Sequence, residues 1–102
     1  MNDKSAESKA IAQTAVVRGG YAREILSNPL FKEIFIKLKG DLLNRFRSSE
    51  LNDEGERSNI WREFRNLENI EKHLNKVLTD GALGTKTLSQ MDKMKNVTGI
   101  KT

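Results

Sequence analysis

The sequence predicts an all-α protein, an antiparallel two-helix hairpin with short flanking helices. Two long segments, 29–47 and 54–79, carry apolar residues at three- and four-residue spacing, the period of an amphipathic helix. A polar stretch, Ser48 to Ser58, lies between them and predicts the turn. The chain's one proline directly follows an asparagine, which predicts where the first long helix begins.

The first hairpin helix is expected to begin at a corner formed by Asn28 and Pro29. Proline disfavours helical geometry in the residue before it, asparagine is a favoured N-cap, and proline suits the first helical position. The segment "YAREILS" before the corner can form a short helix on a different path. The inward stripe of the helix comprises Phe31, Ile34, Phe35, Leu38, Leu42 and Phe46.

A second apolar strip lies on the same helix, away from that stripe. Ile36 and Leu43 are seven residues apart, so they lie on one face, and Gly40 beside them would let another backbone approach closely. Two interpretations are open. Either the segment before Pro29 folds over the strip, or the strip contacts another subunit.

The second hairpin helix is expected to begin near Glu54, because Asp53-x-x-Glu56 has capping-box spacing, and to run to about Thr79. Gly81 then has the place of a left-handed C-cap residue. Trp61 falls well off the inward stripe. It is covered by a flanking segment, anchors a partner, or stacks on a base. The inward stripe comprises Ile60, Phe64, Leu67, Ile70, Leu74, Val77 and Leu78.

Three regions follow from this pattern. Residues 1–20 form a flexible or conditionally helical N-terminal arm, which Gly19-Gly20 ends or hinges. Residues 21–82 form the helical hairpin domain, and residues 83–102 form a basic C-terminal tail with a possible short helix around Leu88 and Met91.

Composition argues against catalysis. The chain has 102 residues and no cysteine, so it is one domain at most, and disulfides and thiolate zinc sites are excluded. With a single histidine, His73, a catalytic dyad or a His-rich metal site is not available. The stretch "GALGTKT" departs from the phosphate-loop spacing. No enzyme activity, cofactor or metal is therefore expected, and no segment is apolar enough to span a membrane.

The charge pattern leaves nucleic-acid binding open. Net charge is +4, and the tail from residue 81 has four lysines against one aspartate. Such a mild excess is compatible with nucleic acid without requiring it. The candidate contacts are Arg45, Arg47, Lys86, Lys93 and Lys95.

Two segments, "AREILSNPLFKEIF" (22–35) and "RSNIWREFRNLENIEKHLNKVLTDGAL" (57–83), resemble a group of small, largely uncharacterised tailed-bacteriophage proteins. The shared features are an Asn-Pro-Leu-Phe helix start, a polar loop, a Trp-bearing second helix and a glycine after it. The resemblance implies a phage origin and an accessory role among head-assembly or packaging proteins. It brings no catalytic residues.

These observations together predict a non-enzymatic phage structural or accessory assembly protein, in the virion or the host cytoplasm, that acts through helix-face contacts in the virion or during head assembly and DNA packaging. Its partner would be a copy of itself or a larger phage protein. The predicted contact residues are Ile36, Gly40, Leu43 and Trp61. Two alternatives stay open: a small nucleic-acid-binding module, as packaging subunit or regulator, and an inhibitor that docks a helix into a groove of a host protein.

Overall fold

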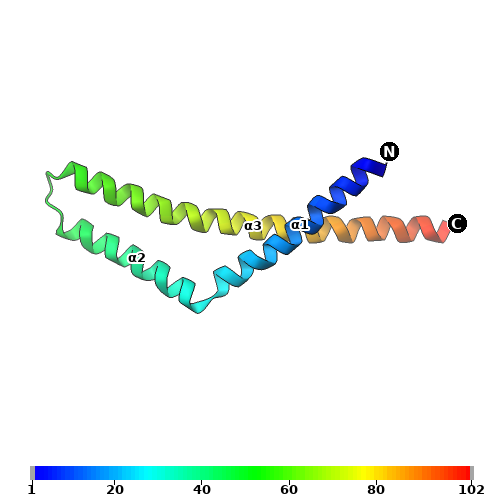
Figure 1. Cartoon of the computed structure of the whole chain (residues 1–102), viewed down its shortest axis with the longest axis horizontal. Helices are drawn as coiled ribbons and strands as arrows, with labels where there is room; N and C mark the ends of the chain where they lie inside the picture. Colours follow the sequence, from blue (N-terminus) through cyan, green and yellow to red (C-terminus); the bar gives the residue numbers. More distant parts are fainter. Residues whose placement is uncertain (1, 102) are drawn as a thin grey trace. The chain divides into compact units, whose positions relative to one another are not determined.

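The computed structural model describes the backbone of residues 2–101 and the side chains of residues 4–94. This part of the chain forms three helices and no strand, which confirms the all-α prediction (Figure 1). The helices are α1 (Asn2–Ser27), α2 (Pro29–Ser48) and α3 (Glu54–Lys101). In the described residues, none of the three holds a stretch that is both long and apolar enough to cross a bilayer.

The chain divides into two compact units. One unit, residues 25–74, pairs α2 with the N-terminal part of α3. The other unit joins the residues up to 24 with those from 75 onward, so that most of α1 pairs with the C-terminal part of α3.

The corner before α2 confirms the predicted cap. The side-chain oxygen of Asn28 accepts hydrogen bonds from the backbone N–H groups of Leu30 at 2.8 Å and Phe31 at 3.2 Å. Asn28 itself is extended, with φ −67° and ψ 123°, and Pro29 is the first residue of the helix. The helix N–H groups that lack internal partners are thus satisfied locally.

The start of α3 confirms half of the predicted capping box. The backbone N–H of Glu56 donates to the Asp53 carboxylate at 3.1 Å, and the helix begins at Glu54. The carboxylate of Glu56 does not return to the cap. It accepts a hydrogen bond from Arg45 on α2 instead.

The flanking elements differ from the prediction. Neither Gly19-Gly20 nor Gly81 ends a helix. Helix α1 runs continuously to Ser27, and α3, which is 48 residues long in total, passes Gly81 and ends at Lys101. No glycine in the described part of the chain has a positive φ, so Gly81 is not a left-handed cap. The flanking helices are therefore long, and the expected separate helix around Leu88 belongs to α3.

The reason is that these glycines form a helix–helix contact. A Cβ added at Gly19 would lie 2.8 Å from the Cα of Gly81, and one added at Gly84 would lie 2.7 Å from the carbonyl oxygen of Ala12. Those distances leave no room for a side chain. Glycine is selected here for close approach of two backbones, as small residues are wherever helices cross closely.

The 25–74 unit has a thin core. Leu42 on α2 and Ile60 on α3 are its only buried apolar residues, at 7% and 5% exposed. Phe31 and Phe35 are half-buried, and their ring centroids lie 4.5 Å apart. Two helices in contact cover only one strip of each other, so most of the remaining apolar surface stays open.

Glycine substitutions distinguish contact positions from open ones. We expect Gly84→Ala to lower the free energy of unfolding by about 1–3 kcal/mol, because the added methyl overlaps the α1 backbone. Gly40→Ala is the matched control. No atom lies within 4 Å of its added Cβ, so it should stabilise α2 by about 0.5–1 kcal/mol. Urea unfolding followed by circular dichroism measures both, and equal shifts would contradict the α1–α3 contact.

Candidate protein-interaction surface

The α2–α3 layer of the 25–74 unit has two flanks, one on each side of the Leu42–Ile60 core. A helix turns about 100° per residue, so residues next to the buried position on each helix fall on opposite flanks. Contacts between the helices show which residues share a flank. Two cation–aromatic contacts mark one flank, and a pair of ion pairs marks the other.

The first flank, which we call the aromatic face, consists of two matching stripes. On α2 the stripe is Lys39, Leu43 and Phe46, and on α3 it is Arg57, Trp61 and Phe64. Both follow the same i, i+4, i+7 spacing with a cation first, a large apolar side chain second and phenylalanine third. Because the helices are antiparallel, each cation meets the other stripe's phenylalanine.

The distances confirm this crossed pairing. The guanidinium of Arg57 lies 4.5 Å from the ring centroid of Phe46, and the ammonium of Lys39 lies 5.9 Å from that of Phe64. Both fall within the range of cation–π attraction. Lys39 also pairs with the carboxylate of Glu71 at 2.5 Å. The two contacts fix the ends of the aromatic face, and Leu43 and Trp61 occupy its centre by helical spacing.

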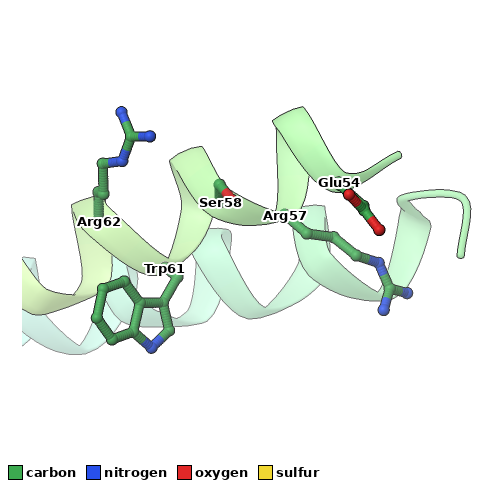
Figure 2. Close-up of a pocket in the computed structure, with 5 residues that line it drawn as sticks. All are labelled: Glu54, Arg57, Ser58, Trp61 and Arg62. Carbon is green, nitrogen blue, oxygen red and sulfur yellow. The ribbon is translucent and has the colours of Figure 1, made fainter. Parts of the chain in front are cut away.

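Trp61 is the most prominent part of this face, with 62% of its surface exposed. Figure 2 shows the indole standing off one side of α3 while Arg62 points to the opposite side. The guanidinium of Arg65 lies 5.2 Å from the indole ring. Beside the ring is a shallow depression of about 470 Å³, lined by Glu54, Arg57, Ser58, Trp61 and Arg62 (Figure 2).

The second flank, the groove face, carries an open groove of about 420 Å³ between α2 and α3. Leucines form its apolar part, and acidic and polar side chains accompany them. The lining residues are Leu38, Asp41, Leu42, Arg45, Glu63, Asn66 and Leu67.

Arg45 spans the groove face between two carboxylates of α3. It lies 2.9 Å from Glu56 and 2.5 Å from Glu63. Hydrogen bonds to Glu56 and Glu63 raise the pKa of Arg45 further above its usual value. The guanidinium therefore stays charged at any ordinary pH. Because the group is exposed, its main effect is to hold the register of the two helices rather than to stabilise the fold strongly.

All four predicted contact residues are open in the structure. Ile36 is 72% and Leu43 is 49% exposed, and a Cβ on Gly40 would meet no atom within 4 Å. Within the 25–74 unit nothing covers Ile36, Leu43 or Trp61. The interpretation that the residues before Pro29 fold over the strip stays a prediction. Whether a partner binds there stays a prediction.

Sequence reasoning missed four members of the aromatic face. Phe46 and Phe64 were assigned to the inward stripes, yet they remain 42% and 37% exposed. Lys39 and Arg57 had no predicted role. One signal could have found them: the spacing cation-x3-apolar-x2-Phe occurs once on each hairpin helix, as Lys39-x3-Leu43-x2-Phe46 and Arg57-x3-Trp61-x2-Phe64.

The candidate nucleic-acid contacts are distributed over both units. Arg45 already pairs with two carboxylates, so it is less available to bind a phosphate group. Arg47 is exposed at the end of α2 in the 25–74 unit. Lys86 and Lys93 are exposed on α3 in the other unit, and the side chain of Lys95 lies outside the described residues. Nucleic-acid binding stays a prediction.

Potential metal ligands are not clustered among the described side chains. Among them, no group of histidine, cysteine or acidic residues is placed to hold a metal ion. His73 is exposed on α3. Comparison of the chain with protein-family models, with curated proteins and with solved structures found no match.

Neighbouring leucines on α2 test the distinction between core and surface. We expect Leu42→Ala to lower the free energy of unfolding by about 2–3 kcal/mol, the low end for a buried leucine, because the thin core can partly collapse. Leu43→Ala should change it by no more than about 0.5 kcal/mol, because that side chain is half exposed. Urea unfolding in dilute solution measures both changes. A larger loss of unfolding free energy for Leu43→Ala would show that the Leu43 side chain is packed rather than exposed.

Proposed function

We propose that this chain is a non-enzymatic assembly protein, which acts through contacts between helix faces in a multi-copy assembly. A larger protein of the same assembly is the other partner that the sequence allows. The two flanks of the 25–74 unit would make the contacts.

One observation carries the proposal: the 25–74 unit leaves most of its large apolar side chains in solvent. Only Leu42 and Ile60 are buried, whereas eleven large apolar residues are substantially exposed. Isolated exposed apolar residues are ordinary, but a concentration of this kind marks a surface that another protein covers. The exposed residues are Ile25, Leu30, Ile34, Ile36, Leu38, Leu43, Phe46, Leu51, Trp61, Phe64 and Ile70.

The energetics favour association for the same reason. A small two-helix layer supplies little net stability, because its buried apolar area barely offsets the entropy lost on folding. Burying a further apolar side chain contributes about 1.5–3 kcal/mol when it is fully removed from water. A partner that covers either flank would therefore stabilise the hairpin and bind it in one step.

The shape of the flanks supports a protein rather than a small molecule as partner. A small-molecule site is usually a concave pocket that encloses most of its ligand. The groove and the depression beside Trp61 are open surfaces on a two-helix layer. Helix faces from another chain match such surfaces in length and periodicity.

The setting that we propose is a bacteriophage particle or its head-assembly and packaging pathway. Support for this comes from the resemblance of residues 22–35 and 57–83 to small phage proteins. The high charge content of the chain, at 31%, is compatible with a protein that stays dispersed until it meets its partner.

Self-association should depend on protein concentration and on Leu43. We expect the average mass from light scattering to rise with concentration for the natural chain. Leu43→Glu should abolish that rise, because it places a charge in the centre of the aromatic face. Trp61, the only tryptophan, gives a second readout: its emission should shift to shorter wavelength as the indole leaves water.

Asn44→Glu is the matched control. It adds the same charge one residue further along α2 at an exposed position, about 200° round the helix from Leu42. It should leave association unchanged. A chain that stays monomeric at all concentrations, with or without the Leu43 substitution, would contradict self-assembly.

A further inference from the structure

The two flanks of the hairpin differ in charge as well as in side-chain type. We infer that copies of this chain bind one another heterologously, with the aromatic face of one hairpin on the groove face of the next. This inference rests on the proposed function and specifies its partner and geometry.

The charges of the central turns, residues 38–46 and 56–67, separate cleanly between the flanks. Three cations, Lys39, Arg57 and Arg65, lie over rings of the aromatic face. The groove face contains three carboxylates and one guanidinium: Asp41, Glu56 and Glu63 with Arg45. The one other charged residue of these turns, Arg62, points away from Trp61 (Figure 2). Over these turns the aromatic face has an excess of cations and the groove face an excess of carboxylates. Two carboxylates border the aromatic face: Glu71 pairs with Lys39, and Glu54 lines the depression beside Trp61.

The apolar side chains of the aromatic face also complement those of the groove face. The groove has an apolar part formed by Leu38, Leu42 and Leu67, which an apolar side chain of another copy can cover. The aromatic face presents Trp61 and Leu43 at its centre. Seating the indole of one copy in the groove of the next would bury it and bring Arg57 and Arg65 towards Asp41 and Glu63.

A symmetric dimer through one face is disfavoured by charge. An isologous contact places each patch on its own copy. A contact between two groove faces would bring together two surfaces that each have an excess of carboxylates. A contact between the central turns of two aromatic faces would bring together two surfaces that each have an excess of cations. Like charges that meet in an interface oppose binding. The heterologous contact pairs opposite charges, and since each hairpin then keeps one free face, it continues into a ring or an open stack.

Two variants of the full chain, each with one face blocked, test the inference. Trp61→Glu blocks the aromatic face, and Leu38→Glu blocks the groove face. Trp61 is 62% and Leu38 is 41% exposed, so neither substitution places a charge at a buried position, and circular dichroism verifies that both variants fold. Each variant alone should associate at least about 30-fold more weakly than the natural chain, as expected for a central contact residue.

The mixture gives the decisive result. Equimolar Trp61→Glu and Leu38→Glu should form a dimer of two chains and nothing larger by sedimentation velocity, because each variant contributes one intact face. If one variant alone dimerises as strongly as the natural chain, the contact is isologous through its intact face, and the inference fails while the proposed function stands. If the natural chain itself never associates, both fail. A mixture that stays monomeric while the natural chain assembles also overturns the heterologous contact.

A second pair of variants keeps the test valid should either glutamate variant unfold. Asp41→Lys on the groove face and Arg65→Glu on the aromatic face alter charge without removing an apolar contact. Each alone should associate more weakly than the natural chain, and their mixture should recover association, because each altered face can pair with a face of opposite charge. Association that is insensitive to both charge reversals would contradict the pairing of an acidic with a basic face.

Discussion

The packing of α2 against α3 determines which apolar side chains of the 25–74 unit are buried and which stay exposed. Two helices can cover only one strip of each other, and here Leu42 and Ile60 are the only buried apolar residues of that strip. Most of the other large apolar side chains of the unit remain exposed on a flank or on an outer face. The limited core and the available binding surface are thus two consequences of the same geometry. A chain of this kind gains stability when another layer covers it.

Cationic side chains lie over the exposed aromatic rings and shield part of each ring from water while no partner is bound. Arg57 over Phe46, Lys39 over Phe64 and Arg65 over Trp61 each cover part of a ring while keeping the charge in water. Such contacts at exposed sites are worth about 0.5–1 kcal/mol, so a partner can displace or retain them at small cost. Over the central turns the same side chains give the aromatic face an excess of cations, although Lys39 is also paired with Glu71. On the opposite flank Arg45 is held by Glu56 and Glu63, and the excess there is negative.

Glycine has different roles in the two units, and the local sequence does not reveal which applies. Gly19, Gly81 and Gly84 are buried where α1 and α3 approach, whereas Gly40 is open. A glycine after an apolar helical stretch is equally typical of a C-cap and of a close helix contact. Gly81 was predicted as a cap for this reason. The neighbouring backbone, with Ala15 and Gly19 against it, decides the matter, and that neighbour is some sixty residues away in the chain.

The sequence by itself determined what depends on residues within one helical turn: the Asn28-Pro29 corner, the Asp53 cap, the periods of the hairpin helices, and the position of Ile36, Leu43 and Trp61 away from the core. Caps and amphipathic faces are local, so a short segment contains the information for them. Only the tertiary structure decided that α3 continues past Gly81 and that Lys39, Phe46, Arg57 and Phe64 join Leu43 and Trp61 in one surface. Such contacts require the register between two helices, as with Arg45, which meets partners 11 and 18 residues away. That register is set by packing of side chains across the hairpin, which no single helical segment specifies.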